Sequence, residues 1–182
     1  MRAVQRFFAD ARRNIFVVAP HVCLVGVNDP GCDQKSHEIA QILHGALPRA
    51  VLLINELPRF LVDMNRAQGS QTNMRKQLRS VAEAGDYIFE IHSYHDMKTF
   101  PDLSSNTHVV LLATKHVGKL SEFEQRVYQS MSNIRIIQGN ITMNDIALES
   151  RQKGWNHVLL EFHDMLTTKQ IQEHVNEIAR MF

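Results

Sequence analysis

The chain has 182 residues and a formal net charge of +1, with 44% hydrophobic and 21% charged residues. These values are typical of a globular protein, and we expect residues 1–182 to form a single domain. The near-neutral charge argues against nucleic-acid or membrane-surface binding, and no apolar run is long enough to span a bilayer. Residues 1–10 lack the apolar segment of a secretory signal. With only two cysteines, Cys23 and Cys32, the sequence favours a cytoplasmic protein with free thiols.

Helical and extended patterns alternate along the chain. Apolar residues at helical spacing predict helices, and short apolar runs rich in β-branched residues predict strands. In chain order we predict helix 3–13, strand 15–19, helix 33–47, strands 50–55 and 60–64, helix 73–84, a strand that starts at Tyr87 and ends near His92, strand 108–114, helix 121–131, strand 134–138, helix 142–151, strand 156–162 and helix 168–182. This alternation predicts a three-layer α/β fold with a mixed, mostly parallel sheet and helices on both faces.

The strand that begins at Tyr87 carries the most informative residues. His92 lies where its apolar run ends, and strands of α/β sheets deliver such groups to the carboxyl edge, where ligands bind. Glu90 lies two residues earlier and points to the same face. Its carboxylate can accept the second ring N–H of His92 and so fix the tautomer of a metal-binding histidine.

Other chemically active groups also lie beside predicted strand ends. His21 follows the first strand and Asp33 comes shortly after it, residues 59–66 carry two arginines, and Glu161 interrupts the last apolar strand. Two histidines and a carboxylate are a sufficient protein shell for a catalytic zinc ion. A nearby glutamate can transfer protons, and an arginine can hold a carboxylate in a two-point contact.

The order of four short motifs resembles the N-formylglutamate amidohydrolase family, whose members are similar to zinc carboxypeptidases and aspartoacylase. The motifs are Ala19-Pro20-His21, the run Arg59-Phe60-Leu61-Val62-Asp63-Met64-Asn65-Arg66, Glu90-Ile91-His92-Ser93, and Glu161. The second is the most specific. The chain is shorter than typical members, and Glu90 stands where the family often has aspartate.

The resemblance implies a zinc-carboxypeptidase-like fold, a Zn²⁺ cofactor and a role for each matching residue. His21, Asp33 and His92 would bind the zinc ion, with Glu38 as the reserve choice for the carboxylate. Asn65 and Arg66 would bind a substrate carboxylate, and Arg59 would bind substrate or polarise its carbonyl. Glu161 would act as the general base. The expected reaction is cleavage of an amide bond in a small carboxylate-bearing substrate, such as an N-formyl or N-acyl amino acid.

Several alternatives remain open at this point. Asp33 can be a helix cap, Arg66 a surface partner of Asp63, and Glu161 a residue of a solvent-facing edge strand. A carboxypeptidase-like metallopeptidase acting on short peptides would need the same groups, and a non-catalytic binding or structural protein could retain the fold. Eight histidines have no matching context and are expected to be ordinary residues: His37, His44, His95, His108, His116, His157, His163 and His174.

Overall fold

The computed structural model describes residues 13–95, 107–113, 120–138 and 144–182. The strands of this part are β1 (Ile15–Ala19), β2 (Ala50–Ile54), β3 (Tyr87–Tyr94), β4 (Val109–Ala113), β5 (Ile134–Gln138) and β6 (Asn156–His163). The helices are α1 (Ser36–Ala46), α2 (Asn73–Val81), α3 (Glu122–Ser130), α4 (Asp145–Lys153) and α5 (Thr168–Ala179), with a 3₁₀ helix η1 (Ala67–Gln71). Within these residues, no helix has both the length and the apolar character needed to cross a bilayer.

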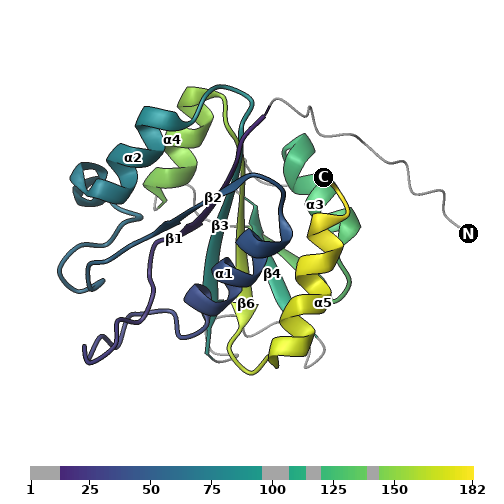
Figure 1. The fold of residues 1–182 in the computed structure, drawn as a ribbon, viewed down its shortest axis with the longest axis horizontal. Helices are drawn as coiled ribbons and strands as arrows, with labels where there is room; N and C mark the ends of the chain where they lie inside the picture. Colours follow the sequence, from purple (N-terminus) through teal and green to yellow (C-terminus); the bar gives the residue numbers. More distant parts are fainter. Residues whose placement is uncertain (1–12, 96–106, 114–119, 139–143) are drawn as a thin grey trace, which may run out of the picture.

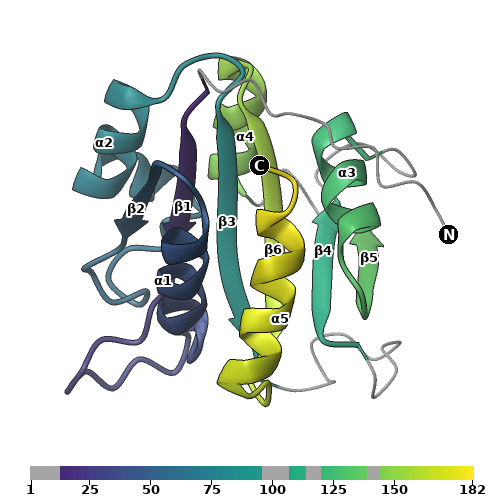
Figure 2. The ribbon, with the colours of Figure 1, turned by 45° about the vertical axis from the view of Figure 1, so that its right-hand side comes forward.

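The strands form one mixed sheet in the order β2-β1-β3-β6-β4-β5 (Figure 2). The neighbours β2, β1, β3 and β6 run parallel, β4 is antiparallel to β6, and β5 is parallel to β4. The carboxyl ends of β1 and β3 therefore lie at the same edge of the sheet. This edge receives the groups that follow β1 and those near the end of β3.

Helices cover both faces of the sheet, which confirms the predicted fold class (Figure 1). One core cluster joins α1, α3 and α5 to the face that carries Phe89, Ile91 and Leu160. The other joins α2 and α4 to the face that carries Phe16 and Ile88. Because side chains alternate along a strand, Glu90 and His92 point toward the α2 and α4 side.

The predicted strand over residues 60–64 is wrong. The backbone N–H groups of Leu61 and Val62 both donate to the carbonyl of Pro58, which forms a turn. Phe60 and Leu61 are 61% and 62% exposed, and no strand in the described part of the chain pairs with this apolar run. The segment instead forms a loop that carries Asp63 and lies next to the carboxyl ends of β1 and β3.

The predicted helix starts are partly correct. Helix α3 begins where predicted, and Ser121 and Glu124 form a capping box at its start. The side chains of Asp33 and Ser36 do not cap α1, whose N-cap is Lys35. Helix α4 is capped by Asn144. The first two residues of the predicted helix 142–151 and the predicted helix 3–13, except Arg13, lie outside the described residues.

The expectation of free thiols is also wrong, because Cys23 and Cys32 form a disulfide. The chain between them turns back through Asp29, whose carbonyl accepts a hydrogen bond from the Cys32 N–H. A count of cysteines could not reveal this turn. The bond closes a short loop directly between the first strand and Asp33.

Candidate metal centre

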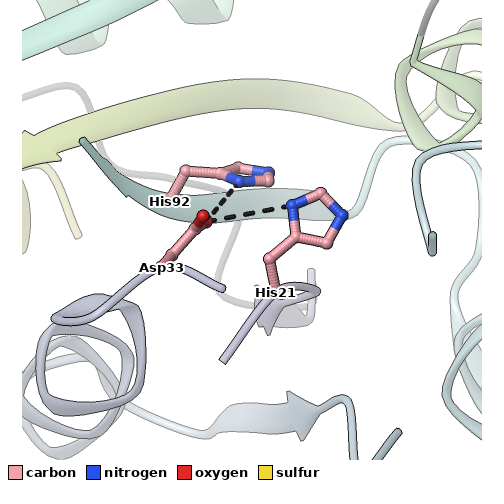
Figure 3. A group of neighbouring side chains, drawn as sticks. All are labelled: His21, Asp33 and His92. Carbon is pink, nitrogen blue, oxygen red and sulfur yellow. Dashed lines mark hydrogen bonds and ion pairs between the residues drawn. The ribbon is translucent and has the colours of Figure 1, made fainter. Parts of the chain in front are cut away.

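His21, Asp33 and His92 converge at the carboxyl edge of the sheet (Figure 3). One ligand atom from each can be chosen so that all three lie within 4.8 Å of one another. Nδ1 of His92 lies 2.7 Å and Nδ1 of His21 lies 3.9 Å from Oδ2 of Asp33. All three residues are buried, so the group is a compact set of polar atoms removed from bulk water. Their roles as metal ligands remain a prediction.

His21 is held with one ring nitrogen aimed into this group. Its Nε2 lies 2.9 Å from Oδ1 of Asp63, a carboxylate oxygen that can only accept, so Nε2 carries the proton. The Nδ1 atom is buried without a hydrogen-bond partner among the described residues. Burial lowers the pKa of His21, and the charge of His92 lowers it further, whereas the hydrogen bond to Asp63 opposes the shift. A neutral imidazole with an unused lone pair is the form that binds a metal ion.

Asp33 is held by a backbone bridge to the segment that follows β1. Val22 and Asp33 form a parallel bridge, and the Asp33 N–H donates to the carbonyl of His21 at 2.7 Å. The disulfide lies immediately beside this bridge, because Cys32 precedes Asp33 in the chain. The reserve choice, Glu38, lies elsewhere and pairs with Lys35 and the hydroxyl of Thr168.

His92 is hydrogen-bonded at both ring nitrogens. Nδ1 contacts Asp33, and Nε2 lies 2.9 Å from Oε1 of Glu90, the partner expected from the sequence. Burial alone would lower the pKa of His92, but the two carboxylates raise it well above its usual value. In the metal-free protein His92 is therefore an imidazolium ion that bridges two carboxylates. Replacing the Nδ1 proton by a metal ion would preserve the hydrogen bond to Glu90.

Glu90 is a fully buried carboxylate with several donors. His157 Nε2 lies 2.7 Å from Oε2, and the Asn144 amide donates to both oxygens at 2.9 and 3.2 Å. Burial would raise the pKa of Glu90, but the hydrogen bonds from His157 and His92 hold it well below its usual range. Glu90 thus stays ionised in the core, which makes it a permanent acceptor for His92.

Glu161 lies beside His92 on the central strand β6. The two residues are Cα partners in neighbouring parallel strands, so their side chains emerge side by side on the same face. Because β6 pairs with β3 and β4, Glu161 is not an edge-strand residue. Burial raises the pKa of Glu161 to about 7; the positive charge of His92 opposes this rise, and the Asp33 carboxylate adds to it.

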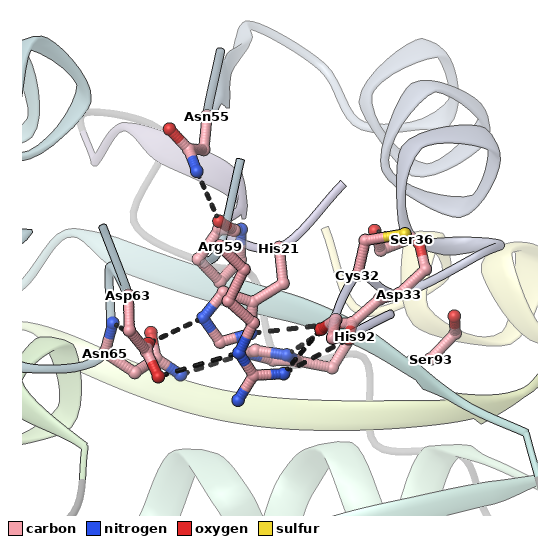
Figure 4. A network of polar contacts seen from close by, with 12 residues as sticks. His21, Cys32, Asp33, Ser36, Asn55, Arg59, Asp63, Asn65, His92 and Ser93 are labelled. Carbon is pink, nitrogen blue, oxygen red and sulfur yellow. Dashed lines mark hydrogen bonds and ion pairs between the residues drawn. The ribbon is translucent and has the colours of Figure 1, made fainter. Parts of the chain in front are cut away.

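Arg59 and Asp63 lie beside the centre (Figure 4), and Arg66 contacts Asp63. The Arg59 guanidinium lies between carboxylates, 3.8 Å from Asp33 and 3.6 Å from Asp63. Arg66 Nε lies 3.7 Å from Asp63, so the pairing considered from sequence is present. Both arginine side chains are about one-third exposed, at 34% and 39%. The amide of Asn65 lies 3.2 Å from Nε2 of His92, and its Oδ1 is buried without a hydrogen-bond partner among the described residues.

The structure brings the sequence-predicted residues together and adds others. Asp63, Asn144 and His157 were not expected to support the centre. Asp63 stood inside the most specific motif but was considered only as a partner of Arg66. Asn144 and His157 belong to segments with no recognisable motif, and only the folded sheet places them beside Glu90.

The fold is similar to that of solved structures despite low sequence identity. The gene product Atu2144 of Agrobacterium tumefaciens matches with a TM-score of 0.64 and 12% identity, covering 95% of this chain and 90% of that chain. A metallo-carboxypeptidase from Burkholderia cenocepacia matches with a TM-score of 0.57 and 12% identity, covering 93% of this chain and 55% of that chain. The present chain therefore spans about half the length of that carboxypeptidase. No family model and no curated protein matches the sequence.

These similarities identify a carboxypeptidase-like α/β fold, as predicted. A structural likeness at this identity shows the fold alone.

Proposed function

We propose that the protein is a metal-dependent hydrolase with a zinc ion bound by His21, Asp33 and His92. The observation that carries this proposal is the buried Nδ1 of His21, which faces Asp33 and has no hydrogen-bond partner among the described residues. An unpaired polar atom in a protein interior is costly and needs an explanation. A metal ion shared with Asp33 and His92 would satisfy it.

The donor set fits zinc. Two imidazole nitrogens and one carboxylate leave a fourth position for water or substrate, as in catalytic rather than structural zinc sites. The outer nitrogens of both histidines already contact carboxylates, Asp63 for His21 and Glu90 for His92. Such contacts orient metal-bound imidazoles and increase their basicity. When bound, zinc would polarise a substrate carbonyl and lower the pKa of a bound water molecule.

The side chains around the centre would each have a role in amide hydrolysis. Glu161 would accept the proton of the attacking water molecule and deliver it to the leaving nitrogen. It suits this role because it lies beside His92, a proposed metal ligand, on the neighbouring strand. Arg66 would hold a substrate carboxylate by a two-point contact. Arg59 would stabilise the negative charge that develops on the carbonyl oxygen. Asn65 would help Arg66 to bind this carboxylate, and its Oδ1, which has no hydrogen-bond partner among the described residues, would accept from an N–H of the substrate.

The substrate proposed is a small amide with a free carboxylate, such as an N-formyl or N-acyl amino acid. A carboxypeptidase-like reaction on short peptides is the second candidate, and the similarity in fold to the Burkholderia metallo-carboxypeptidase favours it. Both reactions require the same metal, base and arginine. A small-molecule rather than nucleic-acid or membrane partner is a further part of this proposal. A cytoplasmic location is no longer part of it, because Cys23 and Cys32 form a disulfide.

A substrate panel would test the function. Purified protein loaded with zinc would be incubated with N-formyl, N-acetyl and peptide substrates that each end in a free carboxylate, and with their amidated counterparts. We expect release of amine from one acid class, its loss on chelation and its return with zinc. Preference for an amidated substrate would contradict the role of Arg66. Hydrolysis that survives complete chelation would contradict metal dependence.

A further inference from the structure

His157 is a buried histidine whose polar contact with the centre, among the residues that the structure describes, is with Glu90 alone. Its Nε2 lies 2.7 Å from Oε2 of Glu90, and both residues are shielded from solvent. The other oxygen, Oε1, faces Nε2 of His92. One carboxylate thus joins His157 to His92, and the Asn144 amide spans both of its oxygens.

The sheet itself creates this arrangement. His157 on β6 is the Cα partner of Ile88 on β3, two residues before Glu90, and the strands run parallel. His157, Glu90 and His92 therefore share the face that points toward α2 and α4. The Nδ1 atom of His157 is buried without a hydrogen-bond partner among the described residues. Because the Glu90 carboxylate can only accept, the proton of His157 lies on Nε2, and donation to Glu90 is the one hydrogen bond of this side chain among the described residues.

The position of Glu90 depends on this contact. A glutamate side chain has three rotatable bonds, and a buried carboxylate that loses a charge-assisted donor must reorient or admit water. If Oε2 is left without the His157 donor, the carboxylate can rotate and carry Oε1 away from His92. The ring of His92 would then lose the acceptor that fixes its tautomer and its plane.

We propose that His157 is a positioning residue of the metal centre: by holding Glu90, it aims Nδ1 of His92 at the metal ion. This inference rests on the proposed metal site. His157 touches neither metal nor substrate, and nothing in its local sequence distinguishes it from the other histidines. Its effect should therefore appear in metal affinity and in the geometry of the centre.

Three substitutions of His157 separate its hydrogen bond from its bulk. His157→Gln places an amide N–H near the position of Nε2 and should preserve the contact. His157→Asn is shorter by one methylene group and should not reach Glu90, and His157→Phe fills the space without a donor. A matched control is His174→Phe, which removes a buried histidine that contacts His108 and Glu177 on the opposite side of the sheet.

Metal affinity would be measured by titrating metal-free protein with zinc against a competing chelator. We expect binding to weaken by about 10–100-fold in His157→Asn and His157→Phe, the usual effect of removing a partner of a metal-bound histidine. His157→Gln and His174→Phe should remain within about 3-fold of the parent, because both keep the donor to Glu90. The visible absorption bands of the cobalt-substituted protein should change in the Asn and Phe variants only.

The outcomes distinguish this inference from the proposed function. If the parent binds one metal ion and His157→Asn binds it equally tightly with an unchanged cobalt spectrum, His157 has no positioning role. If the parent binds no metal ion at all, the proposed function and this inference both fail. The Asn and Gln variants keep the test valid even if His157→Phe does not fold, since both remain polar and differ by one methylene group.

Discussion

Replacing Glu161 with glutamine should stabilise the metal-free protein increasingly as pH rises. Burial raises the pKa of the Glu161 carboxyl from 4.5 to about 7; the charge of His92 opposes this rise, and the Asp33 carboxylate reinforces it. Because the folded-state pKa lies above the unfolded-state value, protonation favours the folded state. The resulting stability is fully present below about pH 4.5 and is lost as pH rises through about 7. Because glutamine cannot ionise, the Glu161→Gln variant does not lose this stability as pH rises.

The magnitude follows from the difference between the two pKa values. Between about pH 5.5 and about pH 8.5, ionisation of Glu161 lowers the free energy of unfolding by at most about 2 kcal/mol. This value is an upper bound, because Glu161 is partly exposed and water reduces the cost of its charge. The gap in stability between Glu161→Gln and the parent should widen by up to that amount over this range.

Urea unfolding of chelator-treated parent and Glu161→Gln at both pH values would measure this gap. Other titrating groups are common to the two proteins, so their contributions cancel to a first approximation. An equal gap at both pH values would refute the raised pKa. After zinc is restored, turnover of the variant should fall by at least ~100-fold with its metal content unchanged, because a positioned general base contributes that much. Loss of zinc would instead make Glu161 a ligand.

Three further substitutions test the surroundings of the centre. Asp63→Ala removes the acceptor of the His21 N–H and should weaken zinc binding by about 10–100-fold, measured by chelator competition; unchanged affinity would contradict its orienting role. Arg66→Lys should mainly raise KM for carboxylate substrates in steady-state assays, because lysine cannot make the two-point contact, and an unchanged KM would show that Arg66 does not bind the carboxylate. Replacing Cys23 and Cys32 by serine should lower the free energy of unfolding by about 2–3 kcal/mol in denaturant titrations, the chain-entropy value for a loop this short, and equal stability would argue against the disulfide.

Much of the fold could be predicted from local patterns. Short apolar runs marked most strands of the sheet, and their alternation with helical segments indicated helices on both faces. The failures come from longer-range causes. The run Phe60 to Val62 is apolar enough for a strand, but it follows a turn at Pro58 and pairs with no strand that the structure describes, so Phe60 and Leu61 are exposed.

The centre was partly predictable for a similar reason. His92 lies at a strand end and Glu90 two residues earlier, so their contact follows from strand periodicity alone. The donor from His157 requires β6 to lie next to β3, although the two residues are 67 positions apart in the chain. The pairing of Cys23 with Cys32 depends on a turn at Asp29, which the number of cysteines cannot reveal.

Metal analysis of the purified protein tests the proposed centre most directly. After equilibration with zinc and removal of the excess, the parent should contain about one zinc ion per chain. His92→Ala should contain almost none, because loss of one of three protein ligands is seldom tolerated. A parent that retains no zinc would contradict the assignment, and so would a His92→Ala variant that retains a full equivalent.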